Sequence, residues 1–176
     1  MENHMYDDSE IQLLIRHFVD NGTVAQSREP EIVILTGSAA TGKTTIRRQK
    51  YSKGYVILDP AELFLTFCGG AVKGFPGEYD EPLRIIGFLI ANQAVAERRD
   101  IVTEMIANDE LTGLIDAMLG IDYHVRVYYI HCVPEESWRR NISRGVNNIS
   151  AYYAQRYNID WLMLAARNYK ALQNNR

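Results

Sequence analysis

The sequence predicts an α/β domain in which helices cover both faces of a central parallel sheet. Three observations support this prediction. Short apolar runs rich in β-formers alternate with segments that suit helices. Residues 37–44, GSAATGKT, match the pattern G-x-x-x-x-G-K-[ST] and follow one of these apolar runs. Acidic residues end two further runs, and ligands of parallel sheets bind at the carboxyl ends of strands.

The first elements surround residues 37–44. Apolar residues recur at helical spacing over residues 10–19, after a cap at Ser9, and predict a helix before the first strand. Residues 31–36 form a nearly uninterrupted apolar run, which is typical of a strand buried in a parallel sheet. Residues 44–50 can continue as a helix, so the glycine-containing motif lies between a strand and a helix N-terminus.

The rest of the chain repeats this alternation. Residues 55–58 predict a short strand, and Pro60 suits the first turn of a helix that reaches Phe67. Segment 69–80 is rich in glycine, has no periodicity and is the candidate for a loop that covers a substrate. The remaining expected elements are a helix at 82–99, a strand at 100–104, a helix at 108–119, a strand at 125–130, and helices at 134–143 and 161–172.

Length and charge limit the class of protein. The chain has 176 residues, of which 47% are hydrophobic, and a net charge of −3. We expect a single domain over residues 1–176, with an N-terminal helix and linker at 1–30 and a lid near 134–160. The acidic balance disfavours nucleic acid as a partner, although a local basic groove would permit it. Polar first residues and the lack of a long apolar run predict a cytoplasmic protein without a membrane span. We also consider a homodimer.

Residues 37–44 predict a phosphate-binding loop, with an ordinary glycine turn as the alternative. A polyphosphate needs converging backbone N–H groups, close approach and a cation at its far end. Lys43 would reach the terminal phosphates, and the Thr44 hydroxyl would hold Mg²⁺. The predicted cofactors are therefore ATP and Mg²⁺. We assign nucleotide binding to Gly37, Ser38, Ala39, Ala40, Thr41, Gly42, Lys43, Thr44 and Thr45.

Carboxylates at the predicted strand ends are candidates for chemistry. Asp59 ends an apolar run directly before a helix start and is the first choice for the base that deprotonates an accepting hydroxyl, unless it only caps that helix. Glu62, one turn into the helix, is the competing carboxylate, unless it is a solvated helix residue. Glu104 ends the next strand and would contact a metal-bound water or a substrate hydroxyl, unless it pairs with a basic residue. We assign Glu62 and Glu104 to substrate binding.

Arginines gather late in the chain. Arg140 and Arg144 are four residues apart, so on one helix they would project from the same face toward one phosphate group. We assign Arg144 to stabilising a transferring phosphoryl group, Arg140 to nucleotide binding and Arg156 to substrate binding. The alternative for this cluster is a solvated basic helix face.

Four segments carry a resemblance to a known group: the loop at 37–44, the segments LDPAE and IVTE, and the late segment WRRNISRG. The chain resembles small P-loop kinases of the zeta-toxin and chloramphenicol-phosphotransferase group over roughly residues 31–160. The resemblance implies a three-layer P-loop NTPase fold with a C-terminal helical lid. It also implies ATP-dependent phosphorylation of a hydroxyl on a small molecule, such as a nucleotide sugar, a nucleoside or an antibiotic-like compound. The implied roles are ATP and Mg²⁺ binding by Lys43 and Thr44, a general base after the second strand, a substrate or metal contact at Glu104, and lid arginines at Arg144 and Arg156.

The sequence departs from this group at two places. The zeta-toxin pattern I-D-x-D would put the base at Ala61, so either Asp59 or Glu62 takes that part or the acceptor differs. Residues 105–108, MIAN, replace a segment that carries a substrate-binding arginine in zeta toxins, so the sequence does not support a nucleotide sugar as acceptor. Two other functions stay open: a polynucleotide 5′-kinase, and a non-catalytic module whose binding depends on nucleotide.

Overall fold

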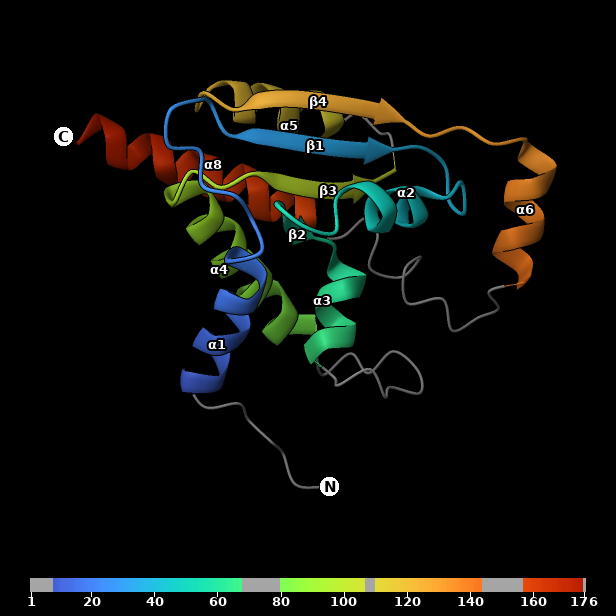
Figure 1. The fold of residues 1–176 in the computed structure, drawn as a ribbon, viewed down its shortest axis with the longest axis horizontal. Helices are drawn as coiled ribbons and strands as arrows, with labels where there is room; N and C mark the ends of the chain where they lie inside the picture. Colours follow the sequence, from blue (N-terminus) through green and yellow to red (C-terminus); the bar gives the residue numbers. More distant parts are fainter. Residues whose placement is uncertain (1–7, 68–79, 107–109, 144–156, 176) are drawn as a thin grey trace.

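The computed structural model describes residues 8–67, 80–106, 110–143 and 157–175. At its centre lies a parallel sheet of four strands in the order β2-β3-β1-β4 (Figure 1). The strands are β1 (Glu31–Thr36), β2 (Val56–Leu58), β3 (Ile101–Met105) and β4 (His124–Tyr129). The predicted α/β fold with a parallel sheet is therefore confirmed.

The helices begin and end close to the predicted positions. α3 (Pro60–Phe67) and α6 (Pro134–Ser143) have the predicted ends. α1 (Asp8–Val19) already contains Ser9, so the predicted cap is wrong; acidic residues in the first turn favour the earlier start. The other helices are α2 (Lys43–Lys50), α4 (Asp80–Ala96), α5 (Glu110–Leu119) and α8 (Asn158–Asn174). In the part of the chain that the structure describes, no helix combines the length and the hydropathy needed to cross a bilayer.

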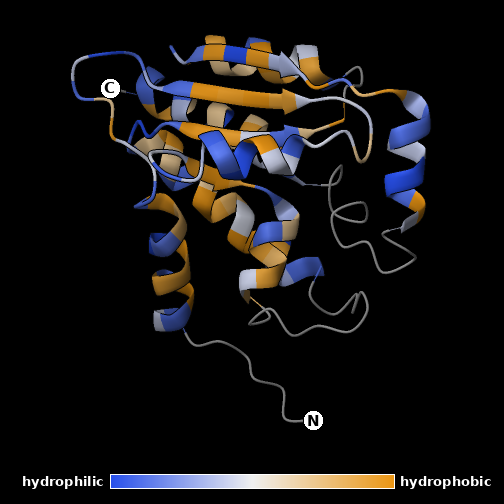
Figure 2. Cartoon of the chain, turned by 45° about the vertical axis from the view of Figure 1, so that its right-hand side comes forward, coloured by the Kyte–Doolittle hydropathy of each residue, from blue (hydrophilic) through white to orange (hydrophobic). Residues whose placement is uncertain are grey.

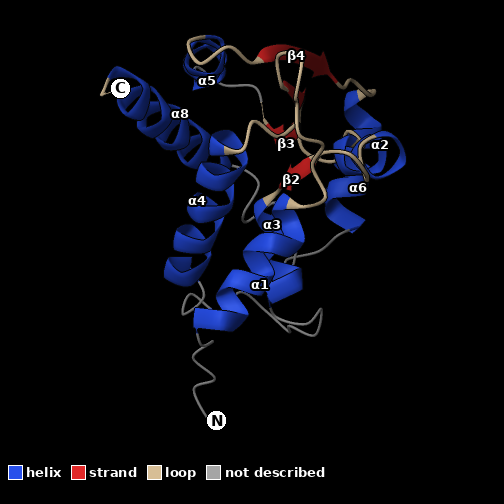
Figure 3. Cartoon of the chain, turned by 60° about the vertical axis from the view of Figure 1, so that its left-hand side comes forward, coloured by secondary structure: helices blue, strands red, loops and turns tan. Residues whose placement is uncertain are grey.

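Helices cover both faces of the sheet because side chains alternate along each strand. One face carries residues such as Ile32 into the larger core, which α1, α3, α4, α5 and α8 complete. The opposite face carries Val33, Leu35 and Val102, against which Ile46 of α2 packs. Figure 3 shows α2 and α6 on the opposite side of the sheet from α4 and α8. This arrangement confirms the predicted layers.

β4 differs from the inner strands in its burial. Every residue of β1 is buried, whereas most residues of β4 are exposed, with Tyr129 at 62%. β4 lies at one edge of the sheet beside β1 alone, and β2 at the other edge is largely buried because α1, α3 and α4 pack on it, whereas α5 packs on β4. Figure 2 shows β1 as largely hydrophobic and α6, which follows β4, as largely hydrophilic. The apolar run at 125–130 predicted a strand correctly, but exposure at an edge depends on strand order and on which helices pack there.

Close packing of α4 and α8 brings the start of α8 to the carboxyl end of β3. At Gly87 of α4, an added Cβ would lie 2.2 Å from Cζ2 of the buried Trp161. One turn earlier in α8, the buried Asn158 side chain donates hydrogen bonds from Nδ2 to Thr103 Oγ1 at 2.8 Å and to the backbone O of Glu104 at 2.6 Å. α8 is therefore fixed beside the sheet edge that carries the predicted site.

Candidate active site

The predicted phosphate-binding loop joins β1 to α2 at the carboxyl edge of the sheet. Gly37 has φ 145° and Gly42 has φ 101°, conformations that glycine adopts at little cost. An added Cβ at Gly37 would lie 2.2 Å from the backbone O of Ile130. Thr41 Oγ1 donates to the backbone O of Ser38 at 3.0 Å and closes the turn. The loop therefore has glycine where the backbone conformation and a close neighbour require it.

Ala40 is a strained residue inside this loop. Its φ is 59°, in the left-handed region, where a residue with a Cβ is disfavoured by roughly 1–2 kcal/mol. The carbonyl of the preceding Ala39 accepts a hydrogen bond from Ser137 Oγ of α6 at 2.6 Å. Contact with α6 thus supports the loop from outside, and strain of this kind is common at ligand-binding sites.

Lys43 and Thr44 lie in the first turn of α2, where the helix dipole favours anions. Lys43 Nζ donates to the backbone oxygens of Gly37 at 2.9 Å and Ser38 at 2.7 Å, so its ammonium lies over the loop. Thr44 Oγ1 donates to Glu104 Oε2 at 2.8 Å. An ammonium at the loop and a hydroxyl backed by a carboxylate are groups that a γ-phosphate and its Mg²⁺ use in P-loop proteins.

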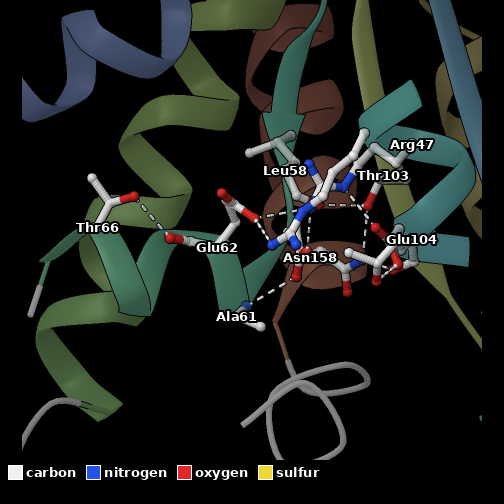
Figure 4. Close-up of polar contacts among 11 residues, drawn as sticks. Arg47, Leu58, Ala61, Glu62, Thr66, Thr103, Glu104 and Asn158 are labelled. Carbon is white, nitrogen blue, oxygen red and sulfur yellow. Dashed lines mark hydrogen bonds and ion pairs between the residues drawn. The ribbon is translucent and has the colours of Figure 1, made fainter. Parts of the chain in front are cut away.

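Arg47 of α2 connects the three predicted carboxylates (Figure 4). Its side chain is 1% exposed. Nε donates to Glu104 Oε1 at 2.6 Å, and Nη2 donates to Asp59 Oδ2 at 3.1 Å and to Glu62 Oε2 at 3.0 Å. Arg48 also donates to Glu62 Oε2, at 3.2 Å, from the exposed side of the helix. One guanidinium therefore joins residues of β3, the end of β2, and α3.

Asp59 both caps a helix and faces this cluster. Its Oδ1 accepts a hydrogen bond from the backbone N of Ala61 at 3.0 Å, which satisfies a free N–H group in the first turn of α3. Its Oδ2 faces Arg47. The capping alternative is thus present in the structure, but it uses only one of the two carboxylate oxygens.

The two candidate bases have pKa values shifted in opposite directions. Burial, followed by the negative charge of Glu104, raises the pKa of Asp59 to about 6, although Arg47 opposes this shift. Burial raises the pKa of Glu62, but the hydrogen bonds and charges of Arg47 and Arg48 together lower it by more. The pKa of Glu62 therefore lies below its ordinary value. A general base works best when its pKa is near the working pH, which favours Asp59.

The site fits a magnesium ion that arrives with the nucleotide. Among the residues described by the structure, no group of three or more His, Cys, Asp or Glu side chains could hold a metal by itself. Mg²⁺ usually keeps several waters and binds through one or two protein oxygens together with phosphates. Thr44 would supply one such oxygen, and Glu104, which accepts a hydrogen bond from Thr44, would accept one from a metal-bound water.

Arg140, which we assigned to nucleotide binding on the sequence, lines a cavity together with residues of the predicted phosphate-binding loop. Its Nε donates to Glu136 Oε1 at 2.7 Å on the same helix. The cavity beside it, of about 400 Å³, adjoins the start of α2 and is the candidate position for the nucleoside part of ATP. Its lining residues are Ala40, Thr41, Gly42, Thr45, Ile46 and Arg140.

Other assignments fall outside the described residues. Arg144, Arg156 and all of the predicted substrate-covering loop 69–80 except Asp80 are among them, and Asp80 begins α4. Residues 144–156 of the predicted lid also lie there, whereas α6 and residues 157–160 are described. These assignments therefore stay predictions.

The sequence reasoning missed Arg47 and Asn158. Arg47 follows Lys43 by four residues, so it lies on the same face of α2, and the predicted buried acids required a counter-charge. Those two facts together were a usable signal. Asn158 had no such signal, because its contacts with Thr103 and Glu104 arise from the packing of α8 against β3.

Comparison with known proteins supports the fold. No protein-family model matches the chain, and no curated protein matches it in sequence. Among solved structures, a chain from the characterisation of the PezAT chromosomal toxin-antitoxin system of the human pathogen Streptococcus pneumoniae is similar, with a TM-score of 0.56 and 19% identity. The match covers 84% of this chain and 69% of that chain. At this identity the similarity shows the fold alone.

Proposed function

We propose that this chain is an ATP-dependent kinase that transfers the γ-phosphoryl group of Mg-ATP to a hydroxyl of a small molecule. One observation carries the proposal: hydrogen bonds connect the phosphate loop to a buried base, from Thr44 to Glu104, on to Arg47, and from there to Asp59. Nucleotide and metal binding can account for Glu104 but leave Asp59, a second buried carboxylate that is costly to keep away from water, without a role. Transfer to a hydroxyl does need such a carboxylate.

The proposed roles follow from position. Lys43 would neutralise charge on the terminal phosphates, and Thr44 would help to hold Mg²⁺, which when bound would supply further neutralisation of phosphate charge. Asp59 accepts the proton of the acceptor hydroxyl while the hydroxyl oxygen forms a bond to the γ-phosphorus. The bond from that phosphorus to the β–γ bridging oxygen breaks, and the electron pair leaves with ADP. The products are a phosphate monoester, ADP and one proton.

Asp59 is a better base than Glu62 on the evidence of their surroundings. The pKa of Asp59 is raised to about 6, so the carboxylate is mostly ionised at neutral pH yet binds a proton readily. Glu62 has a lowered pKa and two arginine partners. We assign Glu62 to the acceptor side of the site and Glu104 to the water shell of the metal.

The resemblance to the zeta-toxin and chloramphenicol-phosphotransferase group supports the kinase proposal, and the fold shared with the PezAT chain agrees with it. That system pairs a toxin with an antitoxin. If the present chain acts in a similar way, its expression would arrest growth, an Asp59→Asn variant would not, and a protein partner would relieve the arrest.

The direct test supplies γ-labelled ATP with nucleotide sugars, nucleosides, hydroxyl-bearing antibiotics and an oligonucleotide with a free 5′-hydroxyl. We expect label on one class of small molecule, and we expect Asp59→Asn to slow transfer by roughly 100-fold or more without loss of ATP binding. Asp116→Asn, an exposed residue of α5, is the matched control. ATP binding with no transfer by the wild type would reject the proposal, and label on the oligonucleotide would favour a polynucleotide kinase.

A further inference from the structure

Arg47 combines burial with an unusual number of acidic partners. Its guanidinium is 1% exposed and contacts carboxylates of three side chains that are distant in sequence: Asp59, Glu62 and Glu104. Burial tends to lower its pKa, but the charges of Asp59 and Glu104 outweigh this and raise it. Arg47 therefore stays charged inside the domain, between the sheet and α2.

Stability alone does not explain this arrangement. Removing a cation and its carboxylates from water costs about as much as their attraction returns, and apolar side chains of similar volume often stabilise a core at least as well. Close by, on the same face of the sheet, the packing is apolar: Ile46 packs against Val33, Leu35 and Val102. The charged cluster is confined to the carboxyl edge that carries the phosphate loop, which points to a role in the reaction.

The shape of the guanidinium suits the task of holding two acids in a fixed relation. The guanidinium is planar and rigid, and it donates a hydrogen bond from Nε to Glu104 and another from Nη2 to Asp59. One rigid group therefore holds both carboxylates. Glu104 in turn accepts from Thr44, the predicted metal ligand. A lysine has the charge but cannot present donors in this planar geometry.

We propose that Arg47 is a positioning residue for phosphoryl transfer: it holds the base Asp59 at a set position relative to Glu104 and Thr44, and so aligns the acceptor hydroxyl with the γ-phosphate. This inference rests on the proposed kinase activity. It assigns no contact between Arg47 and ATP, because the described hydrogen bonds of its guanidinium go to the surrounding carboxylates.

Arg47 also affects proton transfer by Asp59. The charged groups that face Asp59 are Glu104 from β3, Glu62 from α3 and Arg47 from α2. Arg47 is the cation among them, and it lowers the pKa of Asp59 against the two acids. Displacing the guanidinium would therefore raise the pKa of Asp59 further and leave less of the base ionised at neutral pH.

The test compares Arg47→Lys with Arg48→Lys, its exposed neighbour on the same helix. A misplaced base costs about 100-fold in rate, so we expect kcat of Arg47→Lys to fall by about that factor. We expect the Kd for a non-hydrolysable ATP analogue to stay unchanged, and the acid limb of the kcat profile to move to higher pH. Arg48→Lys should keep the wild-type kcat and pH profile. A residue with a merely structural role would not shift the pH profile.

A second pair of variants covers the outcome in which Arg47→Lys fails to fold. Arg47→Gln combined with Glu62→Gln removes one positive and one negative charge together, so the cluster keeps its net charge. The reference is Glu62→Gln alone, in which Arg47 still holds Asp59 and Glu104. We expect the double variant to bind the analogue as the reference does and to turn over about 100-fold more slowly.

Two outcomes would overturn the inference. In the first outcome, Arg47→Lys keeps the kcat and the pH profile of the wild type, or the double variant keeps those of its reference. Arg47 would then not position the base, while the kinase proposal would stand. A wild-type chain that transfers phosphate to no acceptor would reject the kinase proposal and this inference with it.

Discussion

Lowering the pH from 7 to 5 should slow the proposed phosphoryl transfer about tenfold, because the base that we propose, Asp59, acts in its ionised form. With a pKa of about 6, roughly nine-tenths of this carboxyl is ionised at pH 7 and about one-tenth at pH 5. An aspartate with the ordinary pKa of 3.8 would stay more than about 90% ionised across the same range. Since ionisation decreases as the pH falls through the pKa, the rate decreases on the acid side.

The assay measures initial rates of label transfer from γ-labelled ATP at saturating Mg²⁺ and saturating acceptor, at closely spaced pH values. Phosphate groups also titrate near pH 6, so the Kd of an ATP analogue is measured at each pH as a control. Asp59→Asn should show a low rate and no acid limb with a midpoint near 6. Asp116→Asn, on the surface of α5, should reproduce the wild-type profile.

A wild-type rate that stays constant between pH 7 and pH 5, with constant nucleotide affinity, would refute the reasoning. It would show that the base has a low pKa. Glu62 would then be the stronger candidate, because its arginine partners hold its pKa below the ordinary value.

Three further predictions concern glycine and alanine positions. Gly87→Ala would force a methyl group against the ring of Trp161 and should lower the free energy of unfolding by about 1–3 kcal/mol. Gly113→Ala in α5 has room, because the nearest neighbour of the added Cβ would lie at 3.8 Å, and it should raise the free energy of unfolding by about 0.5–1 kcal/mol. Thermal denaturation measures both, and shifts of the same sign would contradict the packing described for α4 and α8. Ala40→Gly should relieve a left-handed conformation and raise the free energy of unfolding by up to about 1 kcal/mol in denaturant titration, and a destabilised variant would argue against strain in the loop. Gly37→Ala, with its Cβ 2.2 Å from a backbone oxygen, should weaken binding of an ATP analogue by about ten- to hundredfold in calorimetry, and unchanged affinity would show that the phosphates bind elsewhere.

Much of the fold could be predicted because its signals are local. The apolar run of β1 and the alternation of strands and helices are visible in short windows of sequence, and the element ends in the structure lie close to the predicted ones. Asp59 and Glu104 share one edge of the sheet, as residues at the carboxyl ends of two neighbouring parallel strands do. The exposure of β4 could not be predicted, because it depends on strand order and on which helices pack on each edge strand.

Glycine spacing, periodicity and strand ends are properties of neighbouring residues, so the predicted phosphate-binding loop, the parallel sheet and the candidate acids could all be named from the amino-acid order. How those acids differ depends on the tertiary structure. Burial and the charge of Glu104 raise the pKa of Asp59, while arginines lower that of Glu62. Both effects depend on side chains brought together from α2, α3 and β3. Electrostatic energies depend on distance and solvent exposure, so they follow from the fold and cannot be read from spacing along the chain.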